Sequence, residues 1–261
     1  MNERRAHALE ILQEGFVLVF TGAGISTASG IPDYRGPNGM WKKFDPKDFT
    51  IEAFLSDPER YWAMRVQRKR DGFYILNAQP NQAHYTITEM QKNGIVREII
   101  TQNTDGLHQK ANSQRVIELH GNASQCVCTK CGRKYPSQWA DEEYEITSIP
   151  PKCSVCGVIL KPDVVLFGEK LDSLNLELAT QAATNCKSVL VVGTTASVFP
   201  ASMIPRIAKR TGARLIEVNE EKTDLTENLA DVTLIGNCVE ILPDLLAGIN
   251  SQLREKMGEL K

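Results

Sequence analysis

The sequence has no excess of charge of either sign and few aromatic residues. Its 261 residues include 30 lysines and arginines against 32 aspartates and glutamates, a formal net charge of −2, and 7% are aromatic. Because a chain without excess positive charge cannot neutralise many phosphates, we expect no direct binding of nucleic acid. The hydrophobic fraction of 42% is that of an ordinary globular protein and excludes a disordered chain.

Long apolar runs are also absent. No stretch approaches the ~20 apolar residues that a membrane-spanning helix needs. The segment 1–14 has a charged, helical pattern and lacks the apolar centre of a signal peptide. We therefore expect a cytoplasmic protein that does not bind membranes. The sequence offers no long tail that suggests a partner, and we expect a monomer.

Cysteine is scarce, but its distribution is informative. Five of the seven cysteines lie between positions 126 and 156, which does not suit a disulfide scaffold. Two turns of the form Cys-x-x-Cys-Gly contain Cys128, Cys131, Cys153 and Cys156. Together they supply four thiolates for a tetrahedral zinc ion with no open position, so we predict one structural Zn²⁺. A redox pair would not explain why the motif occurs twice. Cys126 is expected to face away from the metal.

Short apolar runs that suit strands buried on both faces recur along the chain. They occupy residues 16–20, 95–100, 116–119, 164–167, 188–192, 214–218 and 232–235. Segments with a helical period lie between several of them, at 80–92 after a cap region at Asn77, at 174–185, at 200–211 and at 239–253. This alternation predicts an α/β fold with a Rossmann-like parallel sheet that has helices on both faces.

Two regions interrupt this alternation. Residues 31–48 are rich in proline, glycine and aspartate and predict a long loop of the kind that is often functional. Residues 126–160 carry the cysteines without a buried-strand run. We therefore expect a discontinuous nucleotide-binding domain made of residues 1–35, 80–122 and 163–261. A small domain would combine a cofactor loop and helical insertion at 36–79 with a zinc-ribbon insertion at 123–162.

A glycine-rich turn follows the first predicted strand. Gly22, Ala23 and Gly24 form it, and Ser26 comes two residues later. Glycines in such a turn permit a tight bend and let a phosphate approach the backbone. The third glycine of the dehydrogenase fingerprint is not at its expected place, and no acidic residue stands where it would bind ribose. The standard dehydrogenase fingerprint is therefore not met.

The residues after this turn resemble the sirtuins, the NAD-dependent protein lysine deacylases. Residues 22–35 read GAGISTASGIPDYR, which is similar to the family signature GAGxSxxSGIPDFR except at Tyr34. TQNTDGLH at 101–108 resembles the family's TQNxDxLH, and ELHGN at 118–122 resembles its catalytic His-Gly. Further matches follow in family order, with KPDVVLFGE at 161–169, GTT at 193–195 and VN at 218–219.

Polar residues follow the ends of two predicted strands. His120 ends one of them and is followed by glycine, which suits an exposed imidazole that moves protons near neutral pH. Gln102, Asn103 and Asp105 follow another strand. Because ligands of open α/β sheets bind at the carboxyl ends of the strands, we predict that His120 is catalytic, and the resemblance implies a catalytic role for Asn103 as well.

The resemblance implies an enzyme that uses NAD to remove acetyl, or other acyl, groups from protein lysine side chains. It implies that His120 is the general base on a ribose hydroxyl and that Asn103 orders the ribose and a water molecule. The products would be nicotinamide, free lysine and O-acyl-ADP-ribose. The residues assigned to NAD are Gly22, Ala23, Gly24, Ser26, Asp33, Tyr34, Arg35, Gln102, Asn103, Asp105, Gly193, Thr194, Thr195, Asn219 and Cys238. Mono-ADP-ribosyl transfer and non-catalytic sensing of NAD or ADP-ribose stay open as alternatives.

By the same resemblance, the partner is an acylated-lysine protein or peptide that binds in extended form. One wall for strand addition would be Val164, Val165, Leu166 and Phe167, and the other would be the segment 193–199. Members that prefer acidic acyl groups carry a Tyr-x-x-Arg pair, whose positions hold Arg65 and Arg68 here. Because the tyrosine is absent, we expect acetyl or a longer apolar acyl group rather than succinyl. The plain alternative for the basic run 65–70 is a solvated helix face.

Overall fold

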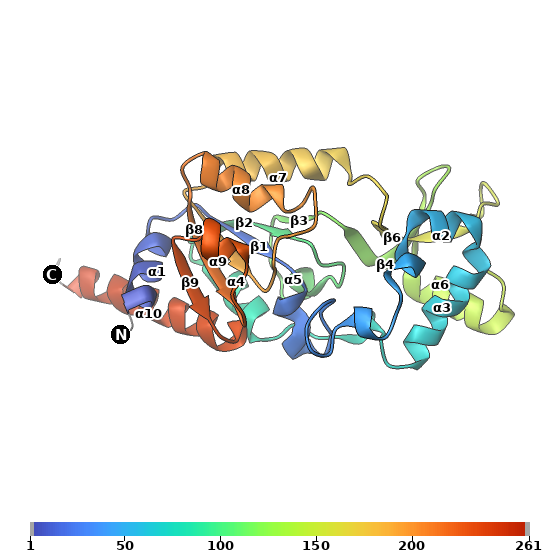
Figure 1. Ribbon diagram of the computed structural model, residues 1–261, viewed down its shortest axis with the longest axis horizontal. Coiled ribbons are helices and arrows are strands. Elements are labelled where there is room, and N and C mark those ends of the chain that lie inside the picture. Colours follow the sequence, from blue (N-terminus) through green and yellow to red (C-terminus); the bar gives the residue numbers. More distant parts are fainter. Residues whose placement is uncertain (1–2, 259–261) are drawn as a thin grey trace.

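The centre of the computed structural model, which describes residues 3–258, is a six-stranded parallel sheet (Figure 1). The strands lie in the order β3-β2-β1-β7-β8-β9. In that order they span Val116–Glu118, Val96–Thr101, Val17–Thr21, Ser188–Val192, Arg214–Asn219 and Val232–Ile235. Six of the seven apolar runs form these strands, so the predicted α/β fold is confirmed. Residues 1–2 and 259–261 of the predicted nucleotide-binding domain lie outside the described residues.

Two groups of helices cover the two faces of the sheet (Figure 1). One group is α7 (Ser173–Asn185) and α8 (Met203–Arg210), and the other is α1 (Glu3–Gln13), α4 (Gln82–Lys92) and α10 (Cys238–Gly258). In β1, Leu18 and Phe20 pack with the first group, whereas Val17 and Val19 pack with the second. Successive side chains of a strand point to opposite faces, so a strand covered on both faces needs a continuous apolar run.

A second, three-stranded antiparallel sheet lies toward the other end of the molecule (Figure 1). Its strands are β5 (Lys134–Pro136), β4 (Gly121–Cys128) and β6 (Leu160–Val164), beside the helices α2 (Ile51–Ser56), α3 (Pro58–Arg70) and α6 (Ser137–Thr147). Trp62 of α3 is fully buried, and its Nε1 donates to the carbonyl oxygen of Leu160 at 2.9 Å. The helices of the first insertion therefore pack on the sheet of the second.

Two local predictions are wrong. The run 164–167 is not a strand of the parallel sheet, because β6 ends at Val164 and pairs antiparallel with β4. The N–H groups of Val165 and Phe167 donate to the carbonyl groups of His120 and Phe49, so neither is available to a strand of the parallel sheet.

The cap of α4 is Asn81 and not Asn77. The side chain of Asn81 accepts the N–H of Ala83 at 2.9 Å, whereas Asn77 ends a separate 3₁₀ turn, η4 (Ile75–Asn77).

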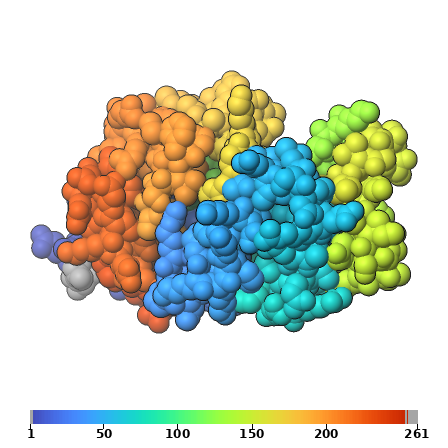
Figure 2. All heavy atoms as spheres, turned by 45° about the vertical axis from the view of Figure 1, so that its right-hand side comes forward, coloured from blue at the N-terminus to red at the C-terminus, as the bar shows by residue number. Residues whose placement is uncertain are grey.

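The predicted loop at 31–48 is confirmed as a long connection with short 3₁₀ turns, η2 (Met40–Lys42) and η3 (Pro46–Phe49). Figure 2 shows this part of the chain, in blue, between the orange C-terminal part and the cyan helices. The shorter elements are η1 (Ala23–Ser29), α5 (Leu107–Lys110) and α9 (Asp224–Asn228). Among the described residues, no helix combines the length and apolar character that a membrane crossing requires.

Candidate active site and zinc centre

The strand order places the candidate site between β1 and β7. From β1 the chain moves outward through β2 and β3 and then returns to β7 on the other side of β1. Ligands of such sheets bind at the carboxyl ends of the strands where the order reverses. The N–H of Gly24 donates to the carbonyl of Gly193 at 2.8 Å, and a Cβ on Gly24 would lie 2.8 Å from the Gly193 Cα. Only glycine therefore fits where the two turns meet.

The turn after β1 continues into η1 and is anchored by Asn81. The side-chain amide of Asn81 donates to the carbonyl of Ile25 at 2.7 Å and lies 3.0 Å from Ser29 Oγ. The same residue caps α4, so it connects η1 to a helix that covers one face of the sheet. Asn81 was not among the predicted site residues, although an asparagine directly before a helical pattern is a signal for a cap.

Asn103, Ser26 and Asp105 meet in one buried cluster. The Nδ2 of Asn103 donates to the carbonyl of Gly22 and to Ser26 Oγ, each at 3.1 Å. With its donors engaged, the Oδ1 of Asn103 is the atom that can accept from a ligand. The hydroxyl of Ser26 donates to Asp105 Oδ2 at 2.8 Å. Burial raises the pKa of Asp105 above its ordinary value.

His120 has a defined tautomer. Its Nδ1 lies 2.8 Å from the carbonyl oxygen of Gln102, which can only accept, so Nδ1 carries the proton and Nε2 carries the lone pair. Burial lowers the pKa of His120 from its ordinary value, which keeps the ring neutral near pH 7. The side chain of Gln102 donates to Thr194 Oγ1 at 2.9 Å. A neutral imidazole with a free Nε2 can act as a general base.

The remaining predicted NAD residues lie at or just after the ends of β7, β8 and β9. The side chain of Asn219 donates to the carbonyl of Thr194 at 3.2 Å, and Thr195 is exposed. Cys238 begins α10 and is buried, and burial raises the pKa of its thiol to about 11. The structure thus brings residues 22–26, 102–105, 193–195 and 219 to one edge of the sheet.

The long loop at 31–48 carries an aromatic contact. The ring of Tyr34 lies 5.1 Å from that of Trp41, and Trp41 lies 5.9 Å from Phe167. Asp33 accepts the N–H three residues further along at 2.9 Å, and Arg35 is exposed. Trp41 was not predicted as a site residue, although it ends the stretch IPDYRGPNGMW at 31–41, a form that also occurs among the sirtuins.

The backbone of Val164–Phe167 is largely paired within the chain. The carbonyl of Val164 accepts the Lys161 ammonium at 2.6 Å, and the N–H of Leu166 donates to Glu169 at 2.7 Å. Lys161 is 5% exposed and forms an ion pair with Glu169 at 3.1 Å. The Phe167 N–H and carbonyl are also engaged. The 43% exposed side chain of Phe167 is the most accessible part of this wall.

Arg65 and Arg68 of α3 do not form a solvated helix face. Arg65 makes two hydrogen bonds to Asp141 of α6, from Nε at 2.6 Å and from Nη2 at 3.1 Å. The guanidinium carbon of Arg68 lies 4.5 Å from the centre of the Phe49 ring. The plain alternative does not hold for these two arginines, because both side chains pack between secondary structure elements, although Gln67 and Arg70 of the same run are exposed.

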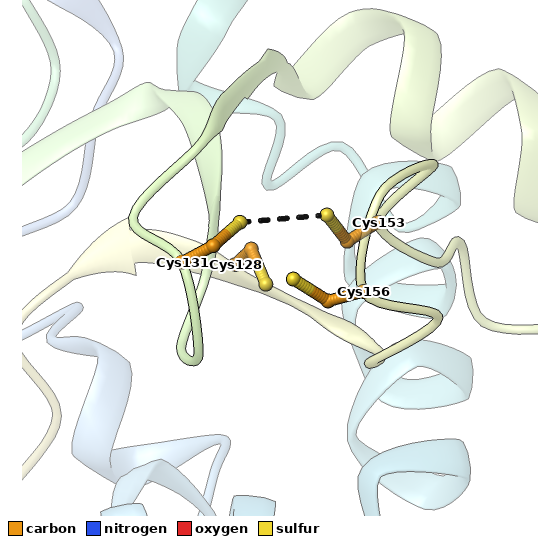
Figure 3. A group of neighbouring side chains, drawn as sticks. All are labelled: Cys128, Cys131, Cys153 and Cys156. Atoms are coloured by element: carbon orange, nitrogen blue, oxygen red, sulfur yellow. Dashed lines mark hydrogen bonds between the residues drawn. The ribbon is translucent and has the colours of Figure 1, made fainter.

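The four cysteines of the two turns point toward one another (Figure 3). Their sulfur atoms all lie within 4.8 Å of one another, and the sulfurs of Cys131 and Cys153 are 3.7 Å apart. Tetrahedral zinc with Zn–S bonds of about 2.3 Å places its sulfurs about 3.8 Å apart, so the geometry fits one Zn²⁺. Four protein ligands leave no open position, and the site is structural. Cys126 lies outside the group, fully buried beside Ser137.

Known proteins share this sequence and architecture. The model of the Sir2 family matches residues 22–200. An NAD-dependent protein deacetylase from Sulfurisphaera tokodaii is 46% identical over 242 residues, which cover 93% of this chain and 94% of the relative. A Sir2 structure with a p53 peptide and NAD+ has a TM-score of 0.84 and 33% identity, with 93% of this chain and 97% of that chain covered.

A Sir2 variant solved with a deacetylated p53 peptide and 3′-O-acetyl ADP-ribose has a TM-score of 0.86 at 35% identity, and the match again covers 93% of this chain and 97% of the other. The match of the family model extends over more than half of the chain, and the similarity to the deacetylase extends over nearly all of it. The chain therefore belongs to the Sir2 family, the sirtuins.

Proposed function

We propose that this protein is an NAD-dependent protein lysine deacylase that transfers the acyl group to ADP-ribose. The observation that carries the proposal is the neutral His120, whose Nε2 is left free by the bond from Nδ1 to the Gln102 carbonyl. The activity of the deacetylase relative and the acetyl-ADP-ribose and peptide held by the Sir2 variant support the same reaction. The products are nicotinamide, unmodified lysine and O-acyl-ADP-ribose.

NAD binds along the carboxyl edge of the sheet. We place the pyrophosphate at the turn Gly22–Gly24, whose glycines pack directly against Gly193 and Thr194 and whose bare backbone lets a phosphate approach. Asn219 and Cys238 stand further along the edge, on the side of the adenosine. Asp105, held by Ser26 at 2.8 Å, meets the carboxamide of nicotinamide, and Tyr34 and Arg35 of the long loop cover it.

His120 and Asn103 do the chemistry at the ribose. The acyl oxygen of the modified lysine attacks the anomeric carbon of the nicotinamide ribose, and nicotinamide leaves. The Nε2 of His120 then takes the proton from a ribose hydroxyl, which attacks the carbon of the resulting imidate, and water completes the release of free lysine. The Oδ1 of Asn103 accepts a hydrogen bond from the ribose or from a water molecule, because its Nδ2 is engaged by Gly22 and Ser26. The zinc ion supports the fold of its module and takes no part in the reaction, since its four ligands come from the protein.

The substrate is an acyl-lysine peptide that lies between Phe167 and the segment 193–199. The enzyme preferentially removes acetyl and longer apolar acyl groups. Arg68 stands at the place of the arginine that would pair with an acidic acyl group, but Arg65 replaces the tyrosine of that pair. Because Arg65 is engaged by Asp141 through two hydrogen bonds, it does not take the place of the tyrosine. A panel of acetyl, succinyl and long-chain acyl peptides with NAD, read by mass, tests this preference. Faster turnover of the succinyl peptide would reverse it.

The test of the catalytic assignment compares His120→Ala with His7→Ala. Replacing His120 should abolish the release of nicotinamide and O-acyl-ADP-ribose from NAD and an acetyl-lysine peptide. Replacing His7, which is exposed on α1, should leave the rate unchanged. Circular dichroism and thermal unfolding show whether each variant is folded. Wild-type turnover by a folded His120→Ala protein would contradict the assignment.

The chain divides into an NAD-binding domain and a small domain. Residues 1–35, 80–122 and 163–261 constitute the NAD-binding domain, and the insertions at 36–79 and 123–162 constitute the small domain. The protein acts in the cytoplasm, because a reducing compartment keeps the four cysteines available for zinc. It acts there as a monomer. Light scattering after gel filtration tests the monomer, and a mass near twice 29.0 kDa would contradict it.

A further inference from the structure

Three buried side chains lie in a line behind Asn103. Thr101 Oγ1 accepts the backbone N–H of Asn103 at 3.0 Å and the hydroxyl of Thr21 at 2.9 Å. The Nε2 of His108 lies 3.0 Å from the same Thr21 oxygen. Thr21, Thr101 and His108 are 0%, 3% and 1% exposed. A hydrogen-bonded chain therefore runs from α5 across the ends of β1 and β2 to the backbone of Asn103.

The direction of this hydrogen-bonded line follows from the bond that Thr21 donates to Thr101. Thr21 has one hydroxyl proton and gives it to Thr101, so its oxygen can only accept from His108. The proton of His108 is therefore on Nε2, and Nδ1 carries a lone pair. Within residues 3–258, that buried Nδ1 has no hydrogen-bond partner. Burial lowers the pKa of His108 to about 3, so the ring is neutral and has this one proton to donate.

The ring of His108 is held in place by α4. Its centre lies 5.0 Å from that of His84, with 63° between the two planes. His84 is fully buried, and its Nδ1 lies 3.3 Å from the backbone N–H of Asn81. Because Asn81 also anchors η1, the helix that holds the His108 ring is tied to the loop next to Asn103.

We propose that His108 is a positioning residue for Asn103, acting through Thr21 and Thr101. The N–H of His108 orients the Thr21 hydroxyl toward Thr101, which keeps a lone pair of Thr101 directed at the Asn103 N–H. A fixed N–H holds the backbone of Asn103 in one position. The position of the backbone in turn determines where Oδ1 of Asn103 meets the ribose. This inference rests on the proposed function, in which Asn103 acts at the ribose.

The test uses variants that separate the hydrogen bond from the packing. His108→Gln keeps an N–H donor near the position of Nε2, whereas His108→Leu keeps an apolar group without a donor. Thr21→Val removes the hydroxyl and preserves the shape, and Thr21→Ser restores it. Thr88→Val is the matched control, because the hydroxyl of this buried threonine contacts Ser113 and the backbone carbonyl of His84 but none of the three side chains in the hydrogen-bonded line.

A positioning role gives a specific kinetic pattern. His108→Leu and Thr21→Val should lower kcat about 10- to 100-fold, as misplacement by about 1 Å does, with little change in KM for NAD. Their double variant should be no slower than the slower single variant, because both break one chain. His108→Gln, Thr21→Ser and Thr88→Val should keep kcat within about 3-fold of the wild type, which is within ordinary context variation.

Several results would overturn the inference. They are wild-type kcat in folded Thr21→Val, loss of kcat in His108→Gln equal to that in His108→Leu, or losses that multiply in the double variant. Nitrogen NMR supplies a readout that needs no activity. His108 should show a protonated Nε2, and Thr21→Val should move the amide resonance of Asn103, while a proton on Nδ1 or an unmoved resonance contradicts the chain. An inactive wild type with these NMR results would contradict the proposed function alone.

Discussion

The Nδ1 of His120 lies 2.8 Å from the carbonyl oxygen of Gln102, and this bond leaves Nε2 as the basic atom of the ring. Burial lowers the pKa of His120 below its ordinary value of 6.5. The neutral, active form is therefore lost only as the pH falls through a value below 6.5. We predict that the acid limb of kcat/KM bends below pH 6.5. A bend above pH 6.5 that His120 variants remove would contradict this environment.

Gly24→Ala should prevent NAD from binding without a change of fold class. The added methyl group would lie 2.8 Å from the Cα of Gly193. A backbone atom cannot move out of the way as the end of a flexible side chain can. The turns after β1 and β7 would be forced apart at the proposed pyrophosphate site. Calorimetric titration with ADP-ribose should show a large loss of affinity. Wild-type affinity in this variant would mean that the pyrophosphate binds elsewhere.

Asp141→Asn should destabilise the protein far more than Glu145→Gln. Both residues lie on α6 and pair with α3, but the Arg65–Asp141 side chains are 16% and 1% exposed, whereas those of Lys69–Glu145 are 24% and 29% exposed. Breaking the buried pair leaves Arg65 without its counter-charge and should cost about 3–5 kcal/mol. The more exposed pair should be worth below about 1 kcal/mol. Urea unfolding compares them, and equal losses would refute the distinction.

Removal of zinc should unfold the cysteine module. The purified protein should contain about one zinc per chain, since four thiolates make one tetrahedral site. Cys153→Ser should lower the zinc content and the melting temperature, because binding energy of a structural metal is folding energy. Cys186→Ser is the control, since Cys186 lies outside the group of four. Full stability of a metal-free Cys153→Ser protein would show that the site is not structural.

Features that depend on a short stretch of the chain could be predicted from the sequence. The run 188–192 becomes β7 without a shift of either end, because a strand covered on both faces must be apolar throughout. The zinc ligands are found because each pair is set by one tight turn. The polar cluster around Asn103 is likewise contained in short contiguous motifs.

Contacts between segments that lie far apart in the sequence could not be predicted. The run 164–167 has the apolar pattern of a buried strand, but its partners are His120 and Phe49. Arg65 finds Asp141 at a separation of 76 residues, and nothing in either segment alone indicates the other. The line from His108 to Asn103 depends on β1 lying beside β2, so it exists only once the sheet has formed.

The central claim is tested most directly by following all products of one reaction. Wild-type protein, NAD and an acetyl-lysine peptide should yield deacetylated peptide, nicotinamide and O-acetyl-ADP-ribose in equal amounts by mass spectrometry. An unchanged peptide with intact NAD, or ADP-ribose attached to protein without loss of the acetyl group, would contradict the account.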